Sequence, residues 1–213
     1  MNITQDKNKL LTRTSKNQIN KILEENPKWK ILDIGCGYRA HDKASTIADI
    51  QDFSNYYKDK KFVQIKEKKL PFKDNEFDFV IASHVIEHII DFEFFIREIE
   101  RISSKGYIEL PTRLADNLVF ENKTDHIWWF LFDDLKNELV ATRKKQILDP
   151  FITVSMSKTL EEIYRDSFVI ELYWEKKIEY QISEQDLYEK FEKISFLKIV
   201  KKYLSKRFRS FTK

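Results

Sequence analysis

Cysteine is almost absent from this chain of 213 residues, and glycine and proline are scarce. The single cysteine, Cys36, excludes an internal disulfide and suits a reducing compartment. No apolar run approaches the ~20 residues that a membrane-spanning helix needs, and the first residues are polar, unlike the apolar core of a signal peptide. We therefore expect a cytoplasmic protein with one domain, or with one domain and an extension.

Net charge is also small, at +3, which gives no reason to expect a nucleic acid as partner. The basic residues are unevenly placed, because residues 193–213 hold eight Lys/Arg and no acid. The apolar residues of this segment fall on one helical stripe, formed by Ile194, Leu197, Val200, Leu204 and Phe208. Such a helix could pack on its own domain, or it could contact the inner face of an anionic membrane peripherally.

Two of the three glycines, Gly35 and Gly37, directly follow the short aliphatic run 31–34. This run is too short for a helix and is typical of a buried parallel strand. Glycines at its end let the backbone turn sharply and let a ligand lie against it. Ligands of open α/β sheets bind beyond the carboxyl ends of strands, so we expect the binding site here.

Strand-like and helix-like segments alternate along the first half of the chain. Strands are expected at 31–34, 47–50, 63–65, 77–82 and 107–110, and helices at 8–26 and 92–102, the second ending at Gly106 as a C-cap. The alternation predicts an α/β fold, a Rossmann-like, doubly wound and mostly parallel sheet.

The pattern changes after Pro111. We expect an antiparallel edge hairpin from 127–132 and 138–143, a helix at 157–166, an extended pair within 168–182 and a long helix at 184–208. We assign residues 1–150 to the sheet domain. Residues 151–213 are then a C-terminal extension that packs on it and ends in the basic amphipathic helix.

Several short motifs occur in one order along residues 28–112: Asp33-Ile34-Gly35-Cys36-Gly37, Leu70-Pro71-Phe72, Asp74-Asn75, Phe77-Asp78 and Ser83-His84-Val85-Ile86-Glu87-His88-Ile89. Together they resemble the class I S-adenosylmethionine-dependent methyltransferases of the type 11 branch. The stretch 106–111, followed by His126-Ile127-Trp128, is similar to a sub-branch associated with bacterial surface-glycan (polysaccharide) biosynthesis. The resemblance implies S-adenosyl-L-methionine as cofactor and O-methylation of a sugar-containing small molecule or glycan intermediate.

The resemblance also implies which residues hold the cofactor. Asp33 would lie near the methionine ammonium, and Asp49 would accept hydrogen bonds from the ribose hydroxyls, a role for which Asp52 competes. Carboxylates suit both tasks because they only accept hydrogen bonds. Gly35 and Gly37 would let the backbone pass beside the amino-acid and ribose parts.

One departure from the family pattern concerns the adenine. Relatives usually carry an acid at the position of Lys66, and charged lysine cannot accept a hydrogen bond. Either Glu67 substitutes, or backbone alone holds the adenine, or the cofactor binds weakly. Leu70 and Ser83 complete the expected cofactor contacts.

Histidines supply the candidates for catalysis. His84 and His88 follow the strand at 77–82 and lie one helical turn apart, and each could act as the general base for a hydroxyl acceptor. A metal site from His84, Glu87 and His88 is conceivable by ligand type, although we expect none.

A third histidine, His126, is the other candidate base, with Asp125 as its partner. Trp128 and Trp129 could form an aromatic platform for a sugar, or could pack within the hairpin, one on each face.

Two other functions must be weighed. The stretch 35–40 formally fits the G-x-G-x-x-G/A fingerprint of a nicotinamide oxidoreductase, but the next residues lack an apolar helical face, and Asp49 follows Gly37 by only twelve residues. The other alternative is an inactive, methyltransferase-like binding or scaffold protein, which Lys66 keeps open. The sequence does not predict the oligomeric state.

Overall fold

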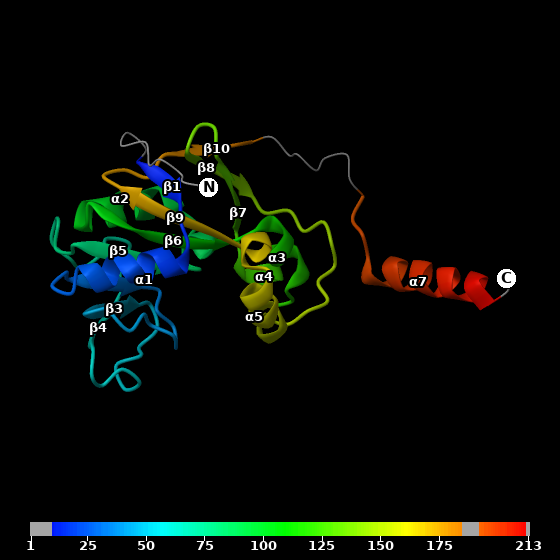
Figure 1. Ribbon diagram of the computed structural model, residues 1–213, viewed down its shortest axis with the longest axis horizontal. Helices are drawn as coiled ribbons and strands as arrows, with labels where there is room; N and C mark the ends of the chain where they lie inside the picture. The colour runs from blue at the N-terminus through cyan, green and yellow to red at the C-terminus, as the bar shows by residue number, and fades with distance from the viewer. Residues whose placement is uncertain (1–9, 185–191, 212–213) are drawn as a thin grey trace.

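The computed structural model describes residues 10–184 and 192–211. Its centre is a seven-stranded sheet with the strand order β1-β9-β6-β5-β2-β3-β4 (Figure 1). The strands of this sheet are β1 (Leu11–Arg13), β2 (Ile31–Ile34), β3 (Thr46–Asp49), β4 (Lys61–Gln64), β5 (Phe79–Ser83), β6 (Lys105–Pro111) and β9 (Val169–Glu175).

The five strands β2 to β6 are parallel, whereas β9 is antiparallel to both β6 and β1. From β2 the chain builds outward through β3 and β4, and then returns to add β5 and β6 on the other side of β2. The order therefore reverses between β2 and β5, which is where open α/β sheets bind ligands. The predicted doubly wound, mostly parallel sheet is confirmed.

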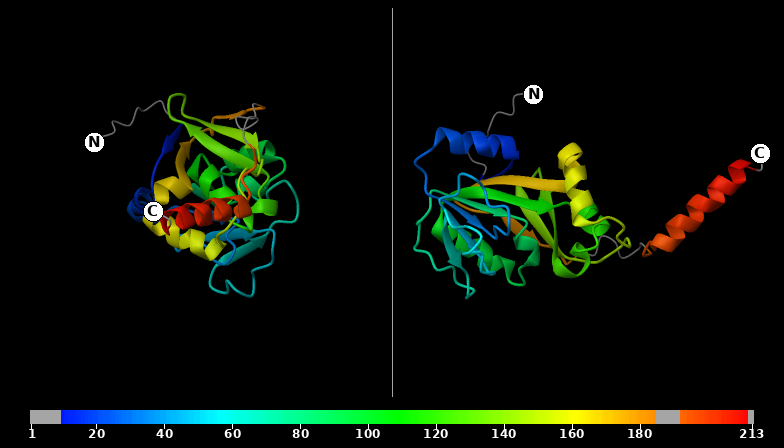
Figure 2. Two further views of the ribbon diagram at one scale, coloured as in Figure 1. Left: turned by 90° about the vertical axis from the view of Figure 1, so that its right-hand side faces the viewer. Right: turned by 90° about the horizontal axis from the view of Figure 1, so that it is seen from below.

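Helices cover both faces of this sheet, and further helices lie beyond the carboxyl end of β6 (Figures 1 and 2). The helical segments of the described chain are α1 (Lys16–Glu25), a 3₁₀ turn η1 (Ile86–His88), α2 (Phe92–Ile102), α3 (Arg113–Leu118), α4 (Asn122–Asp125), α5 (Val154–Ile163), α6 (Arg165–Phe168) and α7 (Phe196–Phe211).

Side chains that alternate between the two faces of each strand explain why the sheet has a separate apolar core on each face. In β2, Ile31 packs in the cluster that includes Ile19 and Leu23 of α1, whereas Leu32 packs in the cluster that includes Phe92 and Ile96 of α2. Neighbouring residues of a strand point to opposite faces, so a central strand buried on both sides must be apolar throughout.

A second, three-stranded sheet has the order β10-β8-β7. The predicted hairpin is confirmed as β7 (Trp128–Asp133) and β8 (Glu138–Arg143), but it belongs to this separate sheet. The antiparallel edge of the main sheet is instead formed by β9 and β1.

Two extended segments do occur within 168–182, as expected, but they do not pair with each other. The strand β9 joins the main sheet, and β10 (Tyr180–Ile182) pairs in parallel with β8. The two strands are separated by Lys176, whose φ of 67° breaks the extended backbone. A boundary at residue 150 thus leaves β9, a strand of the main sheet, in the second segment.

Gly106 does not cap a helix, contrary to expectation. It lies inside β6, and α2 already ends before Ser103. A Cβ at Gly106 would collide with the carbonyl oxygen of Val80 and the indole of Trp174, so the glycine permits β6 to pack closely between β5 and β9.

Other boundaries differ from expectation at helix ends. The first helix begins only at Lys16, after Ser15, whose side chain accepts a hydrogen bond from Gln18 N, because Leu11 belongs to β1 instead. The helix expected at 157–166 is divided into α5 and α6.

The last helix, α7, starts at Phe196 and not at 184, and residues 185–191 lie outside the described part. It stands clear of the sheets in Figures 1 and 2, and its described side chains are exposed except for half-buried Val200. Among the described residues, every helix is too short or too polar to cross a bilayer.

Candidate active site

The turn after β2 shows why the glycines are there. Gly35 and Gly37 adopt φ values of 69° and 48°, which favour glycine. A Cβ on Gly35 would also collide with the side chain of Val85, which follows β5. The turn is therefore pressed against the end of β5, at the point where the strand order reverses.

Asp49, at the end of β3, is buried and already oriented by this turn. One carboxylate oxygen, Oδ2, accepts a hydrogen bond of 3.0 Å from Gly37 N, and Oδ1 accepts one of 2.9 Å from Gln51 N. Each oxygen keeps a further lone pair. The geometry is consistent with the predicted role of Asp49 toward ribose hydroxyls, and Asp52 is bound to its own turn through Ser54 N.

Asp33 is buried in β2, with only 5% of its surface exposed. Burial raises its pKa to about 7, although a hydrogen bond of 2.6 Å from His41 N opposes the shift. A carboxylate in such a place is well suited to a cationic group, whose charge would offset the cost of burial.

An apolar cavity of about 570 Å³ opens beside the glycine turn. Its lining is mostly aliphatic and aromatic, with Asp49 and Glu67 as acceptors, and includes Ile34, Ile50, Ile65, Leu70, Val85 and Phe94. Lys66 is not among the residues that line it. An apolar slot with carboxylates at its rim fits the adenine and ribose that the resemblance implies.

The loop that carries Leu70 is held by two charged residues of α2 that the sequence analysis did not single out. Glu98 accepts a hydrogen bond of 2.7 Å from Leu70 N, while Arg101 donates to the carbonyls of Leu70 and Phe72 at 3.1 and 2.7 Å. Glu98 and Arg101 also form an ion pair at 2.7 Å. The Leu-Pro-Phe motif is thus fixed as one wall of the apolar cavity.

A second cavity, also of about 570 Å³, lies beneath α3, α4 and α5. It shares Gly35, His84 and His88 with the apolar cavity, so the two meet at these residues. Asp33 and Ser83 line it as well. The structure therefore brings the expected cofactor residues and the histidines to one junction.

His84 sits at this junction as a charged hydrogen-bond donor. Its φ is 54°, and its ring lies between Glu87 and Glu109, each 3.2 Å from one ring nitrogen. Burial alone would lower its pKa, but the hydrogen bonds and charges of the two carboxylates raise the pKa to about 10. A ring that keeps its proton at neutral pH is a poor general base, so the geometry favours a positioning role.

Glu109 extends this arrangement into a buried network that sequence reasoning missed. Arg165 contacts Glu109 at 2.5 Å and Glu171 at 3.0 Å, and the hydroxyl of Tyr107 lies within 2.7 Å of both carboxylates. The charges of His84 and Arg165 hold the pKa of Glu109 well below its ordinary value despite burial. No periodicity in the sequence could reveal partners that lie 56 residues apart.

His126 is paired with a different acid than expected. Its Nδ1 contacts Asp116 of α3, whereas the main-chain oxygen of Asp125 is bound to His88 Nδ1 at 2.9 Å. Lys144 lies 2.9 Å from the other Asp116 oxygen. Burial raises the pKa of Asp116, but His126 and Lys144 more than offset this and keep the pKa below its usual value. The predicted Asp125–His126 pair is wrong.

The two tryptophans do not form a platform in the second cavity. Trp128 and Trp129 are buried in β7, and their indole N–H groups donate to Ile89 O at 2.9 Å and to Asp116 at 2.5 Å. They pack within the hairpin on opposite faces of the strand, which was the other prediction.

Comparison with known proteins is informative for the core of this site. The family model described as a methyltransferase domain matches residues 32–108. Uncharacterized protein MJ0638 of Methanocaldococcus jannaschii is 32% identical over 130 residues, which cover 54% of this chain and 51% of that protein. The chain thus spans about half the length of this curated relative.

Solved structures resemble this chain at lower sequence identity. An S-adenosylmethionine dependent methyltransferase from Mesorhizobium loti aligns over 74% of this chain and 96% of its own, with 11% identity and a TM-score of 0.42. The PH0226 protein from Pyrococcus horikoshii aligns over 76% and 93%, with 16% identity and a TM-score of 0.42. The strand order itself, and not these scores, establishes the fold.

Proposed function

We propose that this chain, whose residues 32–108 match the family model of a methyltransferase domain, is a class I, S-adenosylmethionine-dependent methyltransferase that O-methylates a sugar-containing small molecule or glycan intermediate. When bound, S-adenosylmethionine supplies an electrophilic methyl group for an in-line displacement. The observation that carries the proposal is the junction of two cavities at Gly35, His84 and His88. One cavity is apolar and suits an adenosyl group, and the other is polar and suits an acceptor.

On the cofactor side, the residues have separable tasks. Asp33 binds the ammonium group, and Asp49 binds the ribose hydroxyls through the lone pairs that its backbone partners leave unused. Leu70 and Glu67 line the adenine slot, where Glu67 replaces the acid that is absent at Lys66.

On the acceptor side, His126 is the best placed general base. Asp116 holds its Nδ1 and so leaves Nε2 to accept a proton. The ring of His88 meets that of His126 edge to face, with centroids 4.5 Å apart. His84 keeps its proton and orients Glu87 and Glu109 instead. A base is required for a hydroxyl acceptor, which supports O-methylation.

The lining of the second cavity supports a polyhydroxylated, anionic acceptor. Its cations Lys16, Arg39, Lys158 and Arg165 are interleaved with carboxylates, so both donors and acceptors of hydrogen bonds are present. Sugar hydroxyls use both, and a phosphate or carboxylate would meet the cations.

The test is a transfer assay with the full-length protein and S-adenosylmethionine carrying a labelled methyl group. Nucleotide sugars, sugar phosphates and the same sugars without their charged group serve as acceptors. Label should appear on a hydroxyl, and His126→Ala should lose transfer while binding of adenosylhomocysteine stays within about twofold. Transfer to nitrogen or carbon, or full activity of His126→Ala, would contradict the proposal. Binding without transfer to any acceptor would favour the scaffold alternative.

A second proposal concerns the location of the enzyme. The helix α7 exposes large apolar side chains, with Leu197 at 79% and Phe208 at 69%, and residues 193–213 hold no acid. We propose that it lies on the anionic inner face of a membrane, beside lipid-linked glycan intermediates.

Co-sedimentation with vesicles tests this. Vesicles that contain phosphatidylglycerol should retain the full chain, and neutral phosphatidylcholine vesicles should not. The double variant Leu197→Ser, Phe208→Ser should lose the retention. Equal sedimentation of both proteins would contradict membrane contact.

A further inference from the structure

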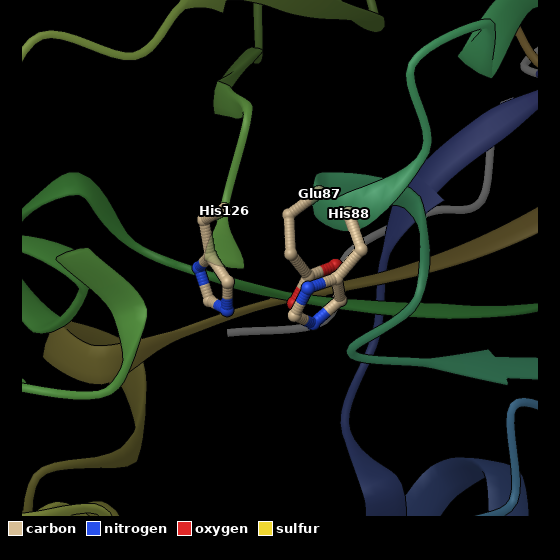
Figure 3. A group of neighbouring side chains, drawn as sticks. All are labelled: Glu87, His88 and His126. Atoms are coloured by element: carbon tan, nitrogen blue, oxygen red, sulfur yellow. The ribbon is translucent and has the colours of Figure 1, made fainter. Parts of the chain in front are cut away.

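Three side chains with metal-ligating atoms converge beside the second cavity, which His88 and His126 line and the buried Glu87 does not. Glu87 and His88 come from the turn η1, and His126 faces them from the segment that follows α4 (Figure 3). Each offers one ligand atom, and these atoms all lie within 4.8 Å of one another. From the sequence, the conceivable metal ligands were His84, Glu87 and His88. In the fold, His126 and not His84 completes the cluster.

The carboxylate of Glu87 gives an independent indication of a ligand. Its side chain is fully buried, and Oε1 contacts His84 Nδ1 at 3.2 Å. The other oxygen, Oε2, is also buried and has no hydrogen-bond partner among the described residues. A buried carboxylate oxygen without a partner is costly, so something that the protein atoms do not supply should meet it.

The outer contacts of the two histidines indicate which ring nitrogen is left to bind a metal. The Nδ1 atom of His88 lies 2.9 Å from the carbonyl oxygen of Asp125, which can only accept, so Nδ1 carries the hydrogen. In His126, Nδ1 is in ion-pair contact with the Asp116 carboxylate, which has only acceptor atoms when ionised and so favours the hydrogen on Nδ1. In each neutral ring the lone pair is then on Nε2.

Metal-binding histidines usually donate a hydrogen bond from their other ring nitrogen to a carboxylate or a carbonyl. A carboxylate or a carbonyl that accepts from one ring nitrogen fixes the orientation of the ring and makes the other nitrogen a better ligand. Here Asp116 supports His126, the Asp125 carbonyl supports His88, and His84 supports Glu87. All three ligands are thus oriented.

We propose that Glu87, His88 and His126 bind one divalent transition-metal ion, of the kind that accepts two imidazoles and one carboxylate, such as Zn²⁺. Two histidines and one carboxylate form a common N/O ligand set that leaves positions open for water or substrate. Ligand atoms at about 2.1 Å from such an ion lie roughly 3 to 3.5 Å apart. The cluster must therefore contract slightly, which exposed His88 permits.

The role of the ion rests on the proposed function. An acceptor hydroxyl bound at an open position would become more acidic, as metal-bound water does. The hydroxyl proton would pass to water, the oxygen would attack the methyl carbon of S-adenosylmethionine, and the C–S bond would break with adenosylhomocysteine as the leaving group. In the metal-bound protein the Nε2 atom of His126 is a ligand, and the ion takes over the activation of the hydroxyl that His126 performs in the metal-free protein.

The experiment is a titration of full-length, chelator-treated protein with Co²⁺ and with Zn²⁺, followed by visible absorption and by calorimetry. One ion should bind per chain, with the visible bands of Co²⁺ in a nitrogen- and oxygen-ligated site. Glu87→Gln and His126→Ala should each weaken binding at least about 100-fold, and Asp116→Asn about 10- to 100-fold. His41→Ala should leave metal binding unchanged, because the His41 ring contacts Asn20 outside the cluster.

Adenosylhomocysteine binding by each variant separates this proposal from the proposed function and checks that the variant folds. Stoichiometric metal binding that depends on Glu87 and His126 supports the site, whether or not the cofactor binds. No stoichiometric binding by a protein that binds adenosylhomocysteine, or binding that both substitutions leave unchanged, would overturn it.

Discussion

Replacing Asp33 by asparagine should separate cofactor binding from the stability of the protein. The carboxylate is 5% exposed, and its pKa is raised by burial from 3.8 to about 7. The ammonium of the cofactor would favour the ionised form, so binding should remove the proton from Asp33. Asparagine keeps the size and can still accept from His41 N, but it carries no charge.

The expected pH dependence follows from these pKa values. Below pH 7, where the cofactor amine remains protonated, affinity for adenosylhomocysteine should fall about tenfold for each pH unit. At pH 6 about 0.9 protons should be released for each molecule bound, because about nine-tenths of Asp33 is then protonated in the free protein. Asp33→Asn should bind about 10- to 100-fold more weakly at pH 8, since a charge-assisted hydrogen bond is lost, and without this pH dependence.

The stability of the ligand-free protein should fall as pH rises, whereas its affinity for the ligand should rise. The unfolded carboxyl ionises near pH 3.8 and the folded one near pH 7, so the unfolded state binds fewer protons between these values. The ligand-free protein therefore loses stability as pH rises from about 4 to about 7, by at most about 4 kcal/mol. Asp33→Asn removes this cost and should unfold at a higher temperature than the native chain at pH 8.

Calorimetric titrations with adenosylhomocysteine in two buffers of different ionisation enthalpy measure both the affinity and the proton release. Thermal unfolding without ligand measures the stability. If Asp33→Asn binds as tightly as the native protein, or if native binding between pH 5 and 7 is independent of pH, the placement of Asp33 beside the ammonium is refuted.

Two further predictions concern the cofactor turn. Asp49→Asn should weaken binding of adenosylhomocysteine about 10- to 100-fold through the loss of charge-assisted hydrogen bonds, while Asp52→Asn, an exposed neighbour bound to its own turn, should bind normally; equal losses would show that Asp49 has no special role. Gly35→Ala should destabilise the fold by about 2 kcal/mol or more, because alanine is strained at a φ of 69° and its Cβ collides with Val85. Adding Val85→Ala should recover part of this loss in thermal unfolding, and no recovery would mean that the collision is not its cause.

Local pattern was enough to predict the centre of the fold. The aliphatic run of β2 and the amphipathic face of α2 appear where the sequence indicates, because each is specified by residues close together in the chain. Among its described residues, the link from β2 to β3 contains no helix, whereas the nicotinamide fingerprint is expected to open one. The family model of a methyltransferase domain matches residues 32–108, within the segment where the motifs indicate that resemblance.

Long-range pairing was the part that local pattern could not supply. Asp116 and Glu109 received no role, since their partners His126, Lys144 and Arg165 come from other elements of the fold. Adjacency in sequence instead suggested Asp125 as the partner of His126.

The role of Gly106 was likewise set by contacts with residues far away in the sequence. A glycine after a helix is typical of a C-cap, and only the contacts of Val80 and Trp174 show that it serves strand packing. The edge strand β1 was absorbed into a predicted helix for a similar reason, because its pairing partner β9 lies more than 150 residues away.

The most direct test of the central claim is a calorimetric titration of the full chain with S-adenosylmethionine, adenosylhomocysteine and NADH. We predict that the first two bind with one molecule per chain and that NADH does not bind. Absence of binding by either adenosyl ligand, at a protein concentration where the chain is folded, would contradict the assignment of the apolar cavity and with it the proposed activity.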